Sequence, residues 1–379
     1  MAGANFTVNA TARGVDFSFS GYSDSLKPLV DYSLKNIRLY AKHQGVVTDL
    51  SKLESFRQAL VRQYRNEKKQ TPYRQLMGDL AATIYQPYWS SQVMADALEQ
   101  LDLTQLPAFV HTLLQQSEVI SLSTGNLTPR TAKKLAKHVR KVLVQGRSFA
   151  PNAEARVVQL SDTRALDVAA LHQDNAVMLY FQGQQQGQEQ ADSVAEQARL
   201  MMLGQILSTP FYAELRTQQQ LGYIVFGSYY PVRAMPGLVF LVQSPDTPID
   251  DIYRAMTSFL TAYQPDFAAQ FRMHQLALVG ELTEAPKNLG EVTGRYWQDL
   301  NEGNMQFNHD QQLQRAIETL NPKDFEAWYR TFISQSLAKN LVIYSQKPSV
   351  GTAQASPKGL LEALPRLDLA PQSRVFRYP

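Results

Sequence analysis

Cysteine is absent from the 379-residue sequence, and this absence excludes several classes of chemistry at once. Without thiols there can be no disulfide, no cysteine nucleophile and no cysteine-ligated zinc or iron–sulfur centre. Long apolar runs are absent as well, since no stretch reaches the roughly 18 to 20 apolar residues that a membrane-spanning helix needs. The net charge of +3 is too small to indicate a polyanionic partner. We therefore expect neither nucleic-acid binding nor membrane association.

Local catalytic motifs are also absent. The sequence contains no G-x-S-x-G, no P-loop and no G-x-G-x-x-G. None of its histidines forms H-E-x-x-H or the inverted H-x-x-E-H, the two patterns that place two metal ligands and a glutamate on one helix face. We therefore expect no metal site within this chain, and we predict that His274, beside an apolar helix face, is a partly buried structural residue. The histidines are His43, His111, His138, His172, His274 and His309.

Hydrophobic periodicity predicts a mixture of helices and strands. With 44% hydrophobic and 19% charged residues, the composition is that of a globular protein with a sizeable core. A polar stretch at 145–155 reads as a linker, the glutamine-rich segment 182–190 as a solvated loop, and the proline-rich segment 348–379 as an extended tail. We predict hairpins over 7–22 and 223–244, helices over 24–41, 53–64, 71–85, 102–114, 129–143, 191–207, 210–220, 247–263, 267–282 and 321–333, and strands at 118–125, 156–160, 175–181 and 340–346.

The two halves of the sequence resemble each other. LDLTQLPAFVHTLL at 101–114 aligns without a gap on LNPKDFEAWYRTFI at 320–333, and both are followed by an apolar strand pattern. Chance similarity between helix-rich segments is the alternative, but the shared order of elements favours duplication of one α+β unit. The second copy has about seventy residues before its hairpin that the first copy lacks. We therefore predict an α+β protein of two homologous units, mostly antiparallel sheet packed with helices, whose first unit lacks its N-terminal strands.

One motif combines a polar helix end with a glycine turn and an aromatic strand: LRTQQQLGYIVFGSYY at 215–230. Gly222 is predicted to take a positive φ where the helix ends. The turn could bring Arg216 and Tyr223 to one patch, where a guanidinium and a phenol would suit a carbonyl or an oxyanion. Alternatively, Arg216 pairs with a carboxylate such as Glu214 and Tyr223 packs in the sheet. The residues alone leave both interpretations open.

A second charged feature is the helix over 129–143, which carries Lys133, Lys134, Lys137, Arg140 and Lys141. Such a helix could meet an anionic surface. A solvated face of an amphipathic helix is the simpler interpretation, and we favour it.

The motif closely resembles the C-terminal half of the pitrilysin and insulin-degrading-enzyme group of inverzincin metalloendopeptidases. The run PFYAELRTQQQLGYIVFGSYYPV carries the resemblance, and LSTGNLT at 122–128 and RYWQDLNEGNMQFN at 295–308 extend it. It covers the chain from about residue 5 to 346. It implies a truncated third α+β domain at 1–150 and a complete fourth domain at 151–347, with the tail at 348–379 outside the family pattern.

The resemblance also implies roles for individual residues. Arg216 and Tyr223 match the family's arginine and tyrosine that contact the substrate backbone and help to stabilise the tetrahedral intermediate, and Tyr212 matches an aromatic residue that lines the cleft. The family's zinc motif is absent here, so zinc would have to come from an N-terminal half or a separate subunit. The implied substrate is a peptide or small unfolded polypeptide, and the compartment would be the periplasm for a bacterial parent enzyme and otherwise the cytoplasm. A non-catalytic peptide-binding or partner subunit, and a degenerate fragment without function, remain as alternatives.

Overall fold

The computed structural model describes residues 3–11, 14–42, 50–144, 156–168, 171–184, 190–233, 235–347, 359–366 and 375–377. Within it the chain divides into two compact units that are discontinuous in sequence. The first comprises Met1–Arg65, Ser91–Ala155 and Pro286–Asn301, and the second comprises Asn66–Ser90, Arg156–Ala285 and Glu302–Pro379. The domain boundary after residue 150, which concerns homologous domains, stays a prediction.

The first unit is built from one hairpin and a set of amphipathic helices. Strands β1 and β2 pair antiparallel from Asn5↔Ser20 to Thr11↔Gly14, which confirms the predicted hairpin. The long helix α1 contacts β2, α5 and α6. Its buried Val30 and Leu34 pack with Leu114 and Leu143 in a small core. The elements are β1 (Asn5–Thr11), β2 (Gly14–Ser20), α1 (Ser23–Ala41), most of α2 (Leu50–Glu67), α4 (Ser91–Gln100), the 3₁₀ turn η1 (Leu103–Gln105), α5 (Leu106–Gln116), α6 (Pro129–Leu143) and α10 (Leu289–Asn301).

The strand predicted at 118–125 does not form. Its residues are exposed or half-buried, and none of the strands that the structure describes pairs with them. A strand is stabilised by the hydrogen bonds of its neighbours, so a local apolar pattern alone does not produce one. Thr124 is instead held by a side-chain hydrogen bond to Thr293 of α10 at 2.5 Å.

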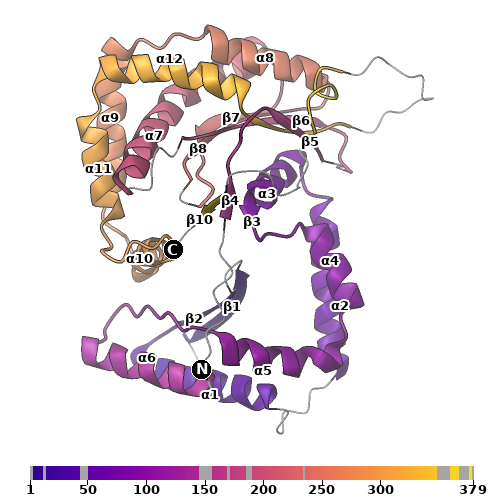
Figure 1. Ribbon diagram of the computed structural model, residues 1–379, viewed down its shortest axis with the longest axis vertical. Coiled ribbons are helices and arrows are strands. Elements are labelled where there is room, and N and C mark those ends of the chain that lie inside the picture. Colours follow the sequence, from indigo (N-terminus) through magenta and orange to yellow (C-terminus); the bar gives the residue numbers. More distant parts are fainter. Residues whose placement is uncertain are drawn as a thin grey trace, which may run out of the picture. The chain divides into compact units, whose positions relative to one another are not determined.

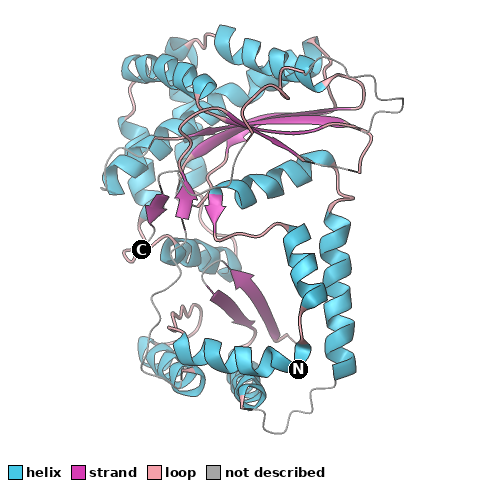
Figure 2. Cartoon of the chain, turned by 45° about the vertical axis from the view of Figure 1, so that its right-hand side comes forward, coloured by secondary structure: helices cyan, strands magenta, loops and turns pink. Residues whose placement is uncertain are grey.

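The second unit contains a five-stranded sheet in the order β5-β9-β6-β8-β7, with helices on both faces (Figures 1 and 2). Only β5 and β9 run parallel; the other neighbours are antiparallel, so the sheet is mixed and mostly antiparallel, as predicted. Its elements are α3 (Pro72–Ile84), β3 (Tyr85–Gln86), β4 (Arg156–Val158), β5 (Arg164–Asp167), β6 (Asn175–Gln182), α7 (Gln190–Tyr212), the π-helical segment η2 (Ala213–Gln218), β7 (Ile224–Tyr229), β8 (Gly237–Ser244), α8 (Ile249–Ala262), α9 (Phe267–Thr283), α11 (His309–Thr319), α12 (Pro322–Ala338), β9 (Leu341–Ser345) and β10 (Val375–Arg377).

The central strands are buried on both faces. Val177, Leu179 and Phe181 of β6 belong to the main core, which also contains buried residues of α7, α8 and α12. The alternate residues Met178 and Tyr180 are equally buried, because side chains of a strand point to opposite faces and α3 contacts β6, β8 and β9 from the other side. This double burial explains why β6 and β8 are continuous apolar runs.

The C-terminal segment is attached to the second unit. Leu361 is fully buried in the main core, and the backbone amides of Leu360 and Leu361 donate to the carboxylate of Asp250 at 3.0 Å. The Ala165 amide of β5 donates to the Pro365 carbonyl at 2.9 Å, so this part of the tail lies along one edge of the sheet. The predicted linker at 145–155 and most of the glutamine-rich loop lie outside the described residues.

Candidate functional site

The helix that leads into the candidate motif is continuous. Two helices were predicted over 191–207 and 210–220, but α7 runs through Pro210 and passes directly into the π-helical segment η2. Proline lacks the amide that a helix interior needs, which is why the sequence suggested a break. Leu207 and Phe211, on either side of Pro210, are fully buried in the main core, so their packing holds the helix together.

The turn after η2 differs from the prediction at Gly222. The residue with a left-handed backbone is Gln220, at φ 55°, and Gly222 does not have a positive φ. Glycine is required at 222 for another reason: a Cβ there would lie 2.2 Å from the carbonyl oxygen of Gln243. The turn therefore presses its backbone against β8, and the Tyr223 amide donates to that same Gln243 carbonyl at 3.1 Å.

Arg216 is fixed to this turn. Its Nη1 donates to the Gly222 carbonyl at 2.5 Å, so the guanidinium lies on the peptide group immediately before Tyr223. The alternative pairing with Glu214 is not the one found, because Glu214 accepts from the Gln219 amide side chain at 2.8 Å. A guanidinium has five N–H donors, so this single bond leaves others for a ligand.

Tyr223 does not pack inside the sheet. Its ring is 45% exposed, and its hydroxyl donates to the carboxylate of Asp174. The Gln243 Nε2 donates to the Tyr223 hydroxyl oxygen at 2.6 Å and to Asp174 at 2.7 Å. The three side chains thus form a closed triangle where β6 and β7 begin and β8 ends.

The triangle changes the electrostatics of the phenol. Partial burial, together with the hydrogen bond to Asp174 and its negative charge, raises the pKa of Tyr223 above its ordinary value. A carboxylate disfavours a neighbouring phenolate and accepts its proton in a hydrogen bond, so Tyr223 is held neutral. In this state it carries one proton, and that proton is directed at Asp174.

Tyr212 lies at the last position of α7, and its ring is 48% exposed. It therefore presents an aromatic surface to solvent directly before η2, which carries Arg216.

Sequence reasoning missed Asp174 and Gln243. Asp174 directly precedes β6 and Gln243 lies near the end of β8, and no short motif joins them to Tyr223. The sequence does contain one indication of these two residues. Each is a polar residue next to or near the end of an otherwise apolar strand, and buried polar residues need hydrogen-bond partners.

Side chains that could together hold a metal ion are not found in the described ranges, which contain no suitable group of three or more histidine, aspartate or glutamate residues. His138 lies 2.9 Å from Asp31, and His274 is partly buried, as predicted, with a pKa lowered by that burial. His43 lies outside the described residues. No helix described here is both long and apolar enough to span a bilayer.

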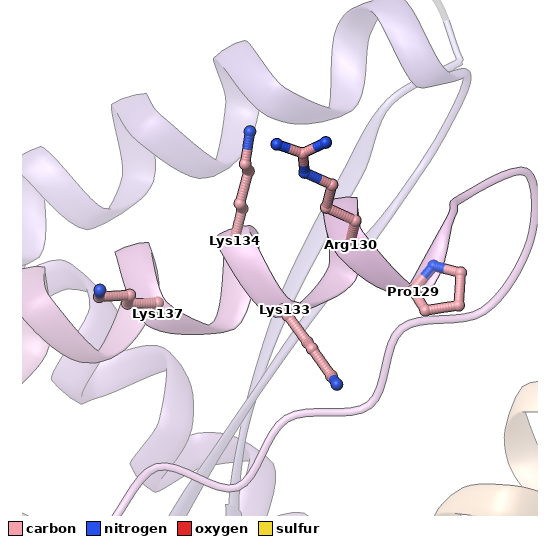
Figure 3. A pocket seen from close by; sticks show the side chains of 5 residues that line it. All are labelled: Pro129, Arg130, Lys133, Lys134 and Lys137. Carbon is pink, nitrogen blue, oxygen red and sulfur yellow. The ribbon is translucent and has the colours of Figure 1, made fainter.

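The basic helix α6 provides no converging site. Thr128 caps it by accepting from the Thr131 amide at 3.2 Å. Arg130, Lys133, Lys134 and Lys137 line a shallow surface hollow, but their side chains point in different directions (Figure 3). The arrangement is typical of a solvated helix face.

Two family models match separate parts of the chain. The middle or third domain of peptidase M16 matches residues 1–97, and the C-terminal lobe domain 4 of PqqF-like PQQ synthase matches residues 202–297. The chain is therefore similar to peptidase M16 proteins over both of these stretches. The second match contains Arg216, Tyr223 and Gln243.

Curated M16 relatives align over most of this chain. Human insulin-degrading enzyme is 23% identical over 345 residues, which cover 88% of this chain and 33% of the enzyme. Protease 3 of Salmonella typhi is 26% identical over 354 residues, which cover 91% of this chain and 35% of the protease. The chain thus spans about a third of the length of these relatives.

Solved M16 structures share the fold. Crystalline pitrilysin matches with a TM-score of 0.76 at 23% identity, over 100% of this chain and 40% of that one. A peptidase M16 inactive domain from Pseudomonas fluorescens matches with a TM-score of 0.62 at 14% identity, over 92% of this chain and 82% of that one. These matches confirm the predicted α+β class and the resemblance to the C-terminal half of the pitrilysin group.

Proposed function

We propose that this chain is the non-zinc C-terminal half of an M16 metalloendopeptidase and contributes Arg216 and Tyr223 to peptide-bond hydrolysis. The observation that carries the proposal is the bond from Arg216 to the Gly222 carbonyl, which fixes a guanidinium beside the residue that bears the phenol. The described residues offer no ligand set for zinc, so the zinc of the enzyme is expected in another segment or chain.

The chemistry assigned to this chain is substrate binding and charge stabilisation. The remaining donors of Arg216 can bind a peptide carbonyl and stabilise negative charge that develops on its oxygen. Once the Tyr223 hydroxyl no longer donates to Asp174, it can donate a hydrogen bond to the same kind of oxygen. Tyr212 contributes an exposed ring for a substrate side chain. The proposed substrate is a peptide or small unfolded polypeptide, and the proposed compartment is the periplasm for a bacterial parent enzyme and otherwise the cytoplasm.

The second candidate is a non-catalytic subunit that holds peptides or pairs with a separate zinc-bearing chain. The structural likeness to an M16 inactive domain favours it. The two candidates differ in whether Tyr223 acts in the transition state or only in binding.

The test is hydrolysis of a fluorogenic peptide by this chain alone and by the chain joined to, or mixed with, its zinc-bearing M16 counterpart. We expect no hydrolysis by the chain alone and chelator-sensitive hydrolysis by the combination. In the combination, Tyr223→Phe should lower kcat by about 10²-fold and change KM much less, because the lost donor acts on the transition state. Tyr22→Phe, at an exposed tyrosine of the first unit, serves as the control.

Two results would contradict the proposal. Chelator-sensitive hydrolysis by the purified chain alone would show that it carries its own metal site. An unchanged kcat in Tyr223→Phe with a raised KM would remove the transition-state role and favour the peptide-binding candidate.

A further inference from the structure

Asp174 is a buried carboxylate that accepts its described side-chain hydrogen bonds from neutral groups. The residue is 7% exposed, and Gln243 beside it is fully buried. Among the interactions described for Asp174, no arginine or lysine contacts it. Burial of a charge is unfavourable unless hydrogen bonds compensate for lost water, and here Tyr223 and Gln243 provide them. A buried carboxylate that is held by hydrogen bonds at the end of an apolar sheet is not explained by packing alone.

His172 does not neutralise this carboxylate. Its Nδ1 lies 3.5 Å from Asp174 but accepts the backbone amide proton of Asp174 at 3.2 Å. A ring nitrogen that accepts a hydrogen bond carries no proton, so this geometry corresponds to the neutral imidazole. The Asp174 carboxylate therefore interacts mainly with the hydroxyl of Tyr223 and the side-chain amide of Gln243.

We propose that Asp174 and Gln243 are positioning residues that hold the Tyr223 hydroxyl at the end of the sheet and control whether its proton is available to a ligand. The proposal rests on the proposed function of Tyr223 and adds two residues to that site. It assigns no contact between Asp174 or Gln243 and the substrate.

The orientation of Gln243 is fixed by a third element. Its Oε1 accepts the backbone amide of Tyr73, in the first turn of α3, at 3.0 Å. The carbonyl side of the amide must therefore face α3, and the Nε2 must face Asp174 and Tyr223. Because Nε2 has two hydrogens, one can go to each partner. The helix α3 thus determines how the hydroxyl of Tyr223 is held.

Within the triangle, the Tyr223 hydroxyl can give up its hydrogen bond to Asp174 while the Asp174 carboxylate keeps a hydrogen-bond donor. When the hydroxyl rotates toward a substrate oxygen, Asp174 still accepts from Gln243. The phenol oxygen likewise keeps a donor in Gln243 while its proton turns away from Asp174. Each member has a second partner, so the hydroxyl can alternate between a resting bond to Asp174 and a bond to a ligand.

The test measures Tyr223 directly and does not depend on peptide hydrolysis. The 379-residue chain is labelled with tyrosine carrying ¹³C at Cζ, and the Tyr223 resonance is assigned by its loss in Tyr223→Phe. Its chemical shift is then followed through the alkaline titration of tyrosine. The titratable and charged groups on the elements around it are Asp174 and His172 before β6, Glu214 and Arg216 of η2, and Tyr73, Arg74 and Asp79 of α3. The ordinary ranges of the carboxylates, histidine and arginine lie well away from that of tyrosine, and the assignment separates the Tyr223 resonance from that of Tyr73.

Two variants are expected to move the titration in opposite directions. Asp174→Asn removes the charge that opposes the phenolate, so the midpoint of Tyr223 should fall. Gln243→Met removes the donor that stabilises the phenolate oxygen, so the midpoint should rise. A loss of local order would move both variants toward an ordinary tyrosine, so opposite shifts identify positioning. Asp246→Asn, at an exposed turn residue after β8, is the control and should cause no shift.

The proposal is overturned if Tyr223 titrates identically in the wild type and in folded Asp174→Asn, or if both variants shift it in the same direction. Circular dichroism shows whether each variant folds. Should neither fold, the wild-type chain decides: an ordinary midpoint for Tyr223 overturns the proposal, and a raised one supports it. A failed peptidase assay together with opposite shifts would remove the proposed function and leave the triangle intact.

Discussion

At the scale of single residues, two contacts fix the turn after η2: Arg216 donates to the Gly222 carbonyl at 2.5 Å, and Gly222 lies directly against the Gln243 carbonyl of β8. The motif predicted a tight turn at Gly222, and the Arg216 guanidinium lies on the carbonyl of that residue, while the Tyr223 hydroxyl lies on Asp174; the convergence of the two heads on a substrate stays a prediction. The reason for the glycine was wrong, because the close approach to Gln243 decides it and the left-handed residue is Gln220. Close approaches between distant strands leave no periodic signal, so sequence patterns cannot identify them.

Replacement of Gly222 by alanine tests the close approach. The new Cβ would meet the backbone carbonyl of Gln243, which cannot rotate away as a side chain can. We expect a loss of about 2 kcal/mol or more in the free energy of unfolding, measured by denaturant unfolding followed by circular dichroism.

The matched control is Gly280→Ala in helix α9, where an added Cβ meets nothing within 4 Å. Alanine is the better helix former, so this change should stabilise the chain by about 0.5 to 1 kcal/mol. Equal stability of the Gly222 variant and the wild type would contradict the close approach.

At the scale of elements, periodicity predicted most helices and the two hairpins, and it failed where tertiary contacts decide. Pro210 suggested a break, yet buried neighbours keep α7 continuous. The segment 118–125, predicted as a strand, lacks a strand partner among the described residues. The aligned positions Asp102 and Asn321 both cap the helices that follow them, at 2.9 and 3.0 Å, which agrees with the proposed duplication of one unit.

Helix α3 carries a carboxylate whose titration should affect stability. Burial and the nearby charge of Glu67 raise the pKa of Asp79 from 3.8 to about 6. The folded chain then binds this proton more tightly than the unfolded chain, so the contribution of Asp79 to stability is greatest below about pH 4, falls as the pH rises to about 6, and stays lower above it. Asp79→Asn removes this loss and should be more stable than the wild type at pH 7.5, by about 1 to 2 kcal/mol.

The comparison is made by urea unfolding at several pH values. The advantage of the Asp79 variant should shrink toward zero as the pH approaches about 4. Asp246→Asn, at an exposed position of the same unit, should show no such trend. A variant that is less stable than the wild type at pH 7.5 would show that the Asp79 carboxylate has a stabilising partner.

At the scale of the whole molecule, composition and the repeat predicted the α+β class, but not the path of the chain between units. The segment Asn66–Ser90 belongs to the second unit although most of the sequence before and after it belongs to the first. Helix α3 in this segment is buried against β6, β8 and β9 and donates to Gln243. Sequence patterns place residues that are neighbours in the sequence in one domain. They therefore could not predict that α3 contacts the candidate site.

The two units should differ in local stability. In the first, the buried core described around α1 consists of Val30, Leu34, Ala41, Leu114 and Leu143, whereas the core of the second extends over β6, β8 and most of the helices. Less buried apolar area gives a smaller free energy of opening, so amides of α1, α5 and α6 should exchange with solvent at least about tenfold faster than those of β6 and β8. Hydrogen–deuterium exchange with mass spectrometry measures this peptide by peptide. If the two sets of amides were equally protected from exchange, the two units would open together. The more extensive core of the second unit would then not explain why the strands around Tyr223 are ordered.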